Sequence, residues 1–454
     1  MPPLGPAYIA AVLERHGFKA DILDMPILRK RIKDIPRFLK NNQYDLYGLS
    51  CNIFNISEGI KIAGLIKEAN PDSKVILGGH CNVFSPGLIF KYGAGFDIIV
   101  RGEGEEAMLS LCSQFNNGST PDLYKINGIS FKDGSRVINT LNAPYLDLNR
   151  LPLPARHLLP HRLYKMYPPF DLLSPVTLIE TSRGCMYNCS FCSISQSARE
   201  RSIENVMEEI REVSGKLGIK GVRFVDSNFV YSTERIADLC DRILGENIKL
   251  AWTCETRVRK IPGDLLKKMS AAGCYMIAYG VESGSKKILD LLNKRITTEE
   301  ITDTFMATKK AGIKTIAYLM LGLPEEDDYS FRETLSLIKK IGPDFVLYTE
   351  LFPIPGSPLT KKIMESGQIT EEGLAEYYIL HKDIFRKRSF GGHCRNKIRQ
   401  RQFFATMGFY FNARFLMRRI REIRGPKELF YLIKGAYCFL LELMDFKFKY
   451  VFKG

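Results

Sequence analysis

The sequence lacks any apolar run long enough to cross a membrane. No segment of its 454 residues approaches the ~20 apolar residues that span a bilayer, and the longest apolar run near the C-terminus, Ala436–Leu441, stops at Glu442. The first residues show no basic flank, apolar core and cleavage site of the kind that directs secretion. The cysteine count, 11, is odd, which argues against a disulfide framework. We therefore expect a cytoplasmic protein.

The cysteine-rich segment "TSRGCMYNCSFC" lacks a fourth cysteine. Cys185, Cys189 and Cys192 have the spacing C-x3-C-x2-C. A structural zinc site needs four ligands, and the candidates elsewhere (Cys240, Cys254 and His157) form no second pair. A [4Fe–4S] cluster with one iron left open would need only three thiolates. Spacing alone leaves both kinds of site possible.

Two α/β regions follow one another along the chain. Residues 1–125 alternate helix and strand patterns, which predicts a doubly wound Rossmann-like domain with strands at 19–24, 44–50 and 74–80. Residues 126–175 hold a small strand pair and a proline-rich connector, which indicates a linker.

A second βα series begins at Val176. Residues 176–360 predict six strands with helices between them, a partial (β/α)6 barrel, and residues 361–454 predict a helical region. The three cysteines come directly after the first of these six strands, at its carboxyl end, where βα folds place their chemistry.

These motifs resemble the radical S-adenosylmethionine (SAM) superfamily. The resemblance rests on the three cysteines after the first strand, with the aromatic Phe191 before the last of them, and on ordered motifs over the following strands. It implies that the cysteines bind a [4Fe–4S] cluster, that SAM chelates the open iron, and that the reduced cluster cleaves SAM to a 5′-deoxyadenosyl radical.

The resemblance also implies a set of SAM contacts. "FVDSNF" stands where the family has its SAM-amino segment, although the usual Gly-Gly-Glu is absent; "CETRV" ends the third strand with an arginine that can clamp a carboxylate; "GVES" ends the fourth strand; and "LMLGLPEE" resembles the adenine-binding glycine segment. "FPIPGSPL" resembles the Pro-x-Pro-Gly-Thr run that follows the sixth strand in one branch of the superfamily. The implied contact residues are Phe191, Asp226, Ser227, Asn228, Arg257, Glu282 and Gly322.

The N-terminal domain resembles the cobalamin (B12)-binding domain of one radical SAM subgroup. This subgroup includes class B methyltransferases and the anaerobic magnesium-protoporphyrin ester cyclase. The resemblance implies that the cobalamin nucleotide tail lies along the carboxyl edge of the sheet, beside Ser50, Gly78 and Gly79. The axial-histidine motif Asp-x-His-x-x-Gly is absent; His80 follows the glycine pair, and a lone histidine is more often structural.

The strand with which such a domain opens is not present before the first helix. The helix begins near Gly5, and a right-handed crossover needs a strand before it. We expect a short apolar strand upstream of Met1.

Acidic residues are scarce in the last part of the chain. From His381 to Gly454 there are 18 Lys and Arg residues against 5 Asp and Glu, which gives +13 of the net charge of +15. The pattern from Arg401 to Arg424 predicts an amphipathic helix. Its apolar stripe consists of Phe404, Met407, Phe411 and Phe415, with Arg414, Arg418 and Arg421 on another stripe. Such a helix could cover the barrel mouth or contact an anionic membrane at the periphery; no RNA-binding module accompanies the charge, which argues against nucleic acid.

The motifs together predict a cobalamin-dependent radical SAM enzyme. Methyl transfer to an unactivated carbon is the leading reaction, in which one SAM methylates cob(I)alamin and a second supplies the radical. An oxidative cyclisation or rearrangement of the magnesium-protoporphyrin ester cyclase type is the alternative enzyme reaction, and a non-catalytic zinc or cobalamin-binding protein is the alternative outside enzymes. The expected partners are a small or lipid-like substrate and a reductant such as flavodoxin or ferredoxin.

Overall fold

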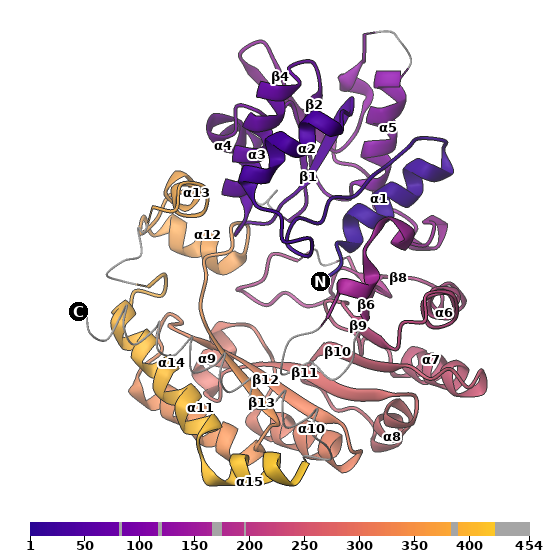
Figure 1. Ribbon diagram of the computed structural model, residues 1–454. Coiled ribbons are helices and arrows are strands. Elements are labelled where there is room, and N and C mark those ends of the chain that lie inside the picture. Colours follow the sequence, from indigo (N-terminus) through magenta and orange to yellow (C-terminus); the bar gives the residue numbers. More distant parts are fainter. Residues whose placement is uncertain (81–83, 117–119, 166–174, 195–196, 383–388, 423–454) are drawn as a thin grey trace.

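The computed structural model describes the chain from Met1 to Glu422 except for residues 81–83, 117–119, 166–174, 195–196 and 383–388. Two sheets flanked by helices dominate the arrangement, with the N-terminal half above the C-terminal half in Figure 1. The first sheet is mixed and the second is parallel. Within these ranges no helix is both long and apolar enough to cross a membrane.

The first sheet has the strand order β1-β2-β3-β4-β5. Its first three strands are parallel: β1 (Leu46–Ser50), β2 (Lys74–Gly78) and β3 (Ile98–Val100). Burial on both faces explains the continuous apolar run in β2, where Val75, Ile76 and Leu77 are at most 1% exposed. The flanking helices are α1 (Leu4–Arg15), α2 (Ile35–Asn41), α3 (Ile56–Ala69), α4 (Pro86–Tyr92) and α5 (Glu105–Asn116).

The strand pair expected in the linker extends this sheet. Strand β4 (Ile129–Asp133) pairs antiparallel with β3, and β5 (Arg136–Asn139) pairs with β4. Ile129 and Phe131 are buried against the same apolar cluster as β3, so burial of their side chains fixes the pair to the sheet edge. The domain limits drawn from the sequence stay a prediction.

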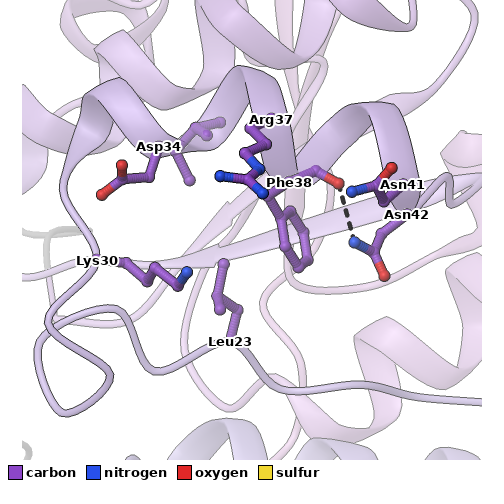
Figure 2. Close-up of a pocket in the computed structure, with 8 residues that line it drawn as sticks. Leu23, Lys30, Asp34, Arg37, Phe38, Asn41 and Asn42 are labelled. Carbon is purple, nitrogen blue, oxygen red and sulfur yellow. Dashed lines mark hydrogen bonds between the residues drawn. The ribbon is translucent and has the colours of Figure 1, made fainter.

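The expected strand at residues 19–24 is not a strand in the structure. A strand needs a partner for its backbone groups, and β1 pairs only with β2 among the described residues. Leu23 instead lines a surface pocket of about 330 Å³ beside α2. Figure 2 shows Lys30 and Arg37 at this pocket, together with the hydrogen bond from Asn42 Nδ2 to the Phe38 carbonyl (2.9 Å).

The second sheet contains the six strands that the sequence predicts. They are all parallel, in the order β13-β12-β11-β10-β9-β6. The strands are β6 (Val176–Ile179), β9 (Gly221–Phe224), β10 (Ala251–Arg257), β11 (Cys274–Glu282), β12 (Lys314–Leu321) and β13 (Phe345–Glu350). The helices between them are α6 (Ile203–Arg211), α7 (Thr233–Gly245), α8 (Gly263–Ala271), α9 (Lys286–Leu291), α10 (Thr298–Lys310) and α11 (Asp328–Ile341).

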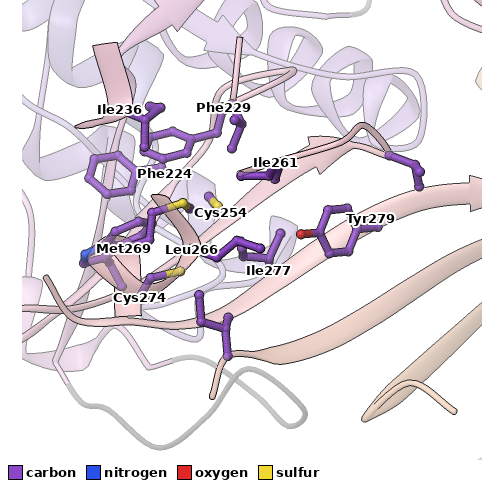
Figure 3. Packing of buried hydrophobic residues seen from close by; sticks show 14 of the residues in the cluster. Phe224, Phe229, Ile236, Cys254, Ile261, Leu266, Met269, Cys274, Ile277 and Tyr279 are labelled. Carbon is purple, nitrogen blue, oxygen red and sulfur yellow. The ribbon is translucent and has the colours of Figure 1, made fainter. Parts of the chain in front are cut away.

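The main core lies between this sheet and its outer helices. Trp252 is fully buried there, and its indole N–H donates to the Ala272 carbonyl (2.8 Å). Figure 3 shows Cys254 and Cys274 among the apolar side chains of this core. These thiols therefore act as small apolar groups.

Helices from the C-terminal part bridge the two halves. Helix α13 (Glu371–Ile379), which follows α12 (Pro358–Glu365), packs against α3 and α4 of the first domain. The backbone N–H of Ser85 donates to Glu371 Oε1 (2.8 Å), and Tyr378 packs near Phe84. Helix α14 (Arg395–Tyr410) packs instead on the helix-covered face of β13, where Gln402 Nε2 donates to the Tyr348 carbonyl (2.7 Å).

The prediction of a single amphipathic helix from Arg401 onward is wrong. Helix α14 ends at Tyr410, and α15 (Ala413–Glu422) begins after a break at which Asn412 Oδ1 accepts from the Phe415 N–H (2.9 Å). Phe404 is 69% exposed, whereas Arg401 is buried and donates to Glu326 Oε1 (2.8 Å). A buried ion pair, which an apolar pattern does not reveal, decides which face of α14 packs.

Candidate functional site

The three cysteines lie on one loop above the carboxyl end of β6. A short antiparallel ribbon closes the base of this loop, formed by β7 (Ser182–Arg183) and β8 (Arg199–Glu200). Ser190 ties the middle of the loop to the end of α9, because its N–H donates to the Leu292 carbonyl (3.0 Å) and its hydroxyl to the Leu291 carbonyl (3.0 Å). The loop is therefore held at both its base and its centre.

Cys185 and Cys189 lie near Cys192 on this loop. Burial raises the pKa of Cys192, and the neighbouring charges of Cys189 and Cys185 raise it further. Nevertheless, within the described ranges no three His, Cys, Asp or Glu side chains converge as ligands of a single metal ion. In a [4Fe–4S] cluster each thiolate binds a different iron, so its ligands stand farther apart than those of one zinc ion. The three thiolates of the loop suffice for such a cluster and leave one iron open.

None of the candidates for a fourth zinc ligand reaches the loop. Cys240 and Cys254 are at most 1% exposed and belong to the core on the helix side of the sheet. The His157 ring contacts Glu14 Oε1 through Nε2 (2.9 Å).

A surface pocket of about 170 Å³ opens beside two of the cysteines. Its lining brings the cysteine loop together with the "FPIPGSPL" segment, which follows β13. The lining residues are Tyr187, Asn188, Cys189, Cys192, Ser193, Ile194, Gly356 and Pro358.

Arg257 joins the third predicted motif to this loop. It ends β10, is 8% exposed, and donates from Nη1 to the Cys189 sulfur (3.0 Å). Its guanidinium also stacks over the Tyr187 ring, 4.3 Å from the centroid. A fixed cation at this position offers a bidentate donor to a carboxylate.

The segment after β9 uses the carboxylate of Asp226 for contacts within the protein. Asp226 is buried and accepts from the hydroxyl of Thr181 (2.7 Å) and that of Ser182 (2.5 Å). Burial raises its pKa, although these hydrogen bonds oppose the shift. Asp226 thus fastens the start of the cysteine loop, and Ser227 points to solvent.

The Asn228 amide has partners at its oxygen but none at its nitrogen in the described structure. Its Oδ1 accepts from the Arg257 N–H (3.0 Å) and from the Thr256 hydroxyl (2.8 Å), which fixes the orientation of the amide. Its Nδ2 is buried and has no hydrogen-bond partner in the described structure. A buried orphan donor is costly, and an acceptor such as a ligand carboxylate would satisfy it.

Glu282 ends β11 and pairs with a residue that the sequence did not single out. Lys294 Nζ donates to Glu282 Oε1 (3.0 Å), and both side chains are at most 10% exposed. The same ammonium lies over the Phe191 ring, 5.7 Å from its centroid. Glu282 has a φ of +66°, a strained value for a non-glycine residue, which is typical of functional sites.

Gly322 follows β12 and lies against helix α14. A side chain at this position would meet Ile398 of α14 at 2.5 Å, and its N–H donates to Glu326 Oε2 (3.0 Å). In this structure the glycine allows α14 to approach β12.

The predicted cobalamin residues meet at the carboxyl edge of the first sheet. The Cys51 N–H donates to the Gly78 carbonyl (2.9 Å), and Gly79 has a φ of +93°. A Cβ on Gly79 would lie 2.4 Å from the Cys51 carbonyl oxygen and 3.2 Å from Ser50 Oγ, so only glycine fits. Ser50 and His80 are both exposed at this edge. At this edge a ligand can therefore approach the main chain of Gly79 closely, because no side chain stands in the way.

The comparisons with known proteins agree with this division. The model of the Radical SAM superfamily matches residues 179–338, and that of the B12 binding domain matches residues 1–111. An uncharacterized methyltransferase of Pyrococcus horikoshii is 29% identical over 97% of this chain and 94% of its own length. The anaerobic magnesium-protoporphyrin IX monomethyl ester cyclase of Rubrivivax gelatinosus is 27% identical over 81% of this chain and 67% of its own length. The radical SAM methyltransferase TsrM from Kitasatospora setae, with cobalamin and a [4Fe–4S] cluster bound, shares the fold with a TM-score of 0.68 at 18% identity, over 81% of this chain and 75% of that chain.

The chain belongs to the B12-binding radical SAM enzymes, related to class B methyltransferases and to the anaerobic magnesium-protoporphyrin cyclase. Its cofactors are a [4Fe–4S] cluster and SAM, and its B12-binding domain implies cobalamin. The alternative of a non-catalytic zinc or cobalamin-binding protein is thereby wrong.

The cysteine loop gives a direct test. We expect anaerobically reconstituted protein to hold about four irons per chain. Replacing Cys185, Cys189 or Cys192 with alanine should each abolish the iron and acid-labile sulfide, because the loop has no fourth cysteine to replace the lost ligand. Cys240→Ala, a buried thiol of the core, is the matched control and should retain both. Cluster retention in any of the three loop variants would contradict the assignment.

Proposed function

We propose that this enzyme transfers a methyl group from SAM to an unactivated carbon of a small or lipid-like substrate. The observation that carries the proposal is the similarity to the Pyrococcus methyltransferase along nearly the whole length of both chains. The presence of both cofactor domains in one chain agrees with it, since such methyl transfer uses cobalamin as well as the cluster.

Different residues at and beside the cysteine loop bind the cluster and SAM. Cys185, Cys189 and Cys192 hold the cluster. Arg257 and the Nδ2 of Asn228 lie at adjacent strand ends and bind the SAM carboxylate, because one is a fixed cation and the other an unsatisfied donor. When bound, these cofactors supply the carbon radical and the methyl group; the protein orients them and excludes water.

The ion pair between Lys294 and Glu282 lies behind the cysteine loop and provides a further contact for SAM. Glu282 faces the loop beside Lys294 and Phe191, so its carboxylate accepts hydrogen bonds from the SAM ribose or amino group. Ser50, Gly78 and Gly79 line the path of the cobalamin nucleotide tail, where the Cβ-free glycine allows close approach.

The SAM assignment predicts the effect of one substitution. Arg257→Ala should weaken SAM binding roughly tenfold to a hundredfold, as expected for the loss of a charge-assisted contact. The exposed Arg295 is the matched control, and Arg295→Ala should bind SAM as the wild type does. Equilibrium dialysis under anaerobic conditions, with iron content measured in parallel, makes the comparison. Wild-type affinity in Arg257→Ala would place the carboxylate elsewhere.

Oxidative cyclisation is the second candidate reaction. It is supported by the 27% identity with the Rubrivivax cyclase over 81% of this chain. Methyl transfer and cyclisation differ in what they release from SAM, so they can be separated before the substrate is known.

The ratio of SAM products decides between the two reactions. With a reductant, cobalamin and a metabolite extract, methyl transfer should release S-adenosylhomocysteine and 5′-deoxyadenosine in about equal amounts, since one SAM gives the methyl group and another the radical. A product that carries the label from methyl-deuterated SAM should accumulate. Release of 5′-deoxyadenosine without S-adenosylhomocysteine or label would instead support cyclisation. The Cys189→Ala variant is the blank.

Two partners complete the proposal. A flavodoxin or ferredoxin supplies the electron to the cluster. Peripheral contact with an anionic membrane is supported by exposed apolar side chains in a part of the chain that carries most of the net charge. These side chains are Phe404 on α14, Phe411 between the two helices, and Leu416 and Met417 on α15. Binding to neutral liposomes as strong as to anionic ones would contradict an electrostatic contact.

A further inference from the structure

Two arginines face each other at the base of the cysteine loop. Arg183 of β7 and Arg199 of β8 are directly opposite partners in the antiparallel ribbon. Their side chains are only 15% and 22% exposed. Like charges directly opposite each other destabilise a strand pair, and partial burial reduces the screening by water. The ribbon that closes the loop therefore needs an anion between its two strands.

Glu103 supplies that anion from the other domain. It lies between β3 and α5 of the B12-binding domain, and its side chain is 16% exposed. Arg199 donates to both of its oxygens, from Nη2 to Oε1 (2.7 Å) and from Nη1 to Oε2 (3.1 Å), while Arg183 Nη1 donates to Oε1 (3.2 Å). The Leu146 N–H completes the set of donors at Oε2 (2.9 Å).

The two arginines depend on Glu103 to different degrees. Arg183 also pairs with Glu105 (2.7 Å) and Glu180 (2.7 Å). In contrast, among the described residues Glu103 is the only carboxylate that pairs with Arg199. Loss of the Glu103 charge would thus leave Arg199 without a counterion and opposite a second cation.

We propose that Glu103 is a positioning residue for the iron–sulfur cluster, because its carboxylate neutralises the two opposed arginines at the base of the cysteine loop. Docking of the B12-binding domain and closure of the cysteine loop are then one event. In the wild type, the loop adopts its ligand geometry only when the B12-binding domain is docked. The cluster site and the cobalamin site therefore form together. This inference rests on the assignment of Cys185, Cys189 and Cys192 as cluster ligands.

Glu103→Gln tests the proposal, because it preserves shape and removes charge. In the full-length reconstituted protein, a chelator should remove iron at least about tenfold faster than from the wild type, as expected for loss of charge-assisted hydrogen bonds. Amide hydrogen exchange should rise over residues 184–194. Glu106→Gln is the matched control, because Glu106 is exposed and lies in the first turn of α5, close to Glu103 in the sequence. It should behave as the wild type does.

A double variant separates charge neutralisation from simple loss of contacts. Glu103→Gln combined with Arg199→Gln removes the unpaired cation, so iron retention should recover to near the wild-type rate. If Glu103 acted only as a packing contact, the double variant would lose iron as fast as Glu103→Gln or faster, and the proposal would be wrong.

The remaining outcomes are also decisive. Iron retention in Glu103→Gln equal to that of the wild type overturns the proposal. If Glu103→Gln does not fold, the double variant must fold and hold iron, or the proposal fails. A wild-type protein that holds no iron or sulfide overturns the assignment of the cysteines instead, which distinguishes the two failures.

Discussion

Parallel pairing of the strands is the constraint on which the site depends. Because all six strands of the second sheet run in one direction, their carboxyl ends lie at one edge. Segments as far apart in the chain as Tyr187 and Pro358 meet there. The cysteine loop after β6, Arg257 at the end of β10 and Glu282 at the end of β11 come together for this reason. The first sheet repeats the principle with Ser50 and Gly79, and α13 joins the two domains.

Ion pairs give this arrangement its fine geometry. Hydrophobic burial explains why the sheets and helices form, but it does not choose between neighbouring positions of a polar loop. Arg257 contacts Cys189, Lys294 restrains Glu282, and Arg401 decides which face of α14 packs. Each pair is buried or half-buried, so loss of one partner would leave an uncompensated buried charge and destabilise the local structure.

The sequence was sufficient for features that repeat along the chain or cluster locally. Spacing identified the three cysteines, and apolar runs identified the six strands. Sequence could not show partners that lie far apart in the chain, such as Lys294 for Glu282 or Arg401 for Glu326. Asp226 illustrates the limit: the motif placed it correctly at the strand end, but only the structure shows that Thr181 and Ser182 occupy its oxygens. The exposed Phe404 shows likewise that an apolar stripe does not prove a buried face.

Mössbauer spectroscopy of the iron-57 cluster, with and without SAM, tests the central claim most directly. Three thiolates leave one iron of a [4Fe–4S] cluster without a protein ligand. If SAM binds that iron beside Arg257, its addition should shift the signal of one iron site and leave the others unchanged. A spectrum that SAM does not alter, in protein that binds SAM, would contradict the account.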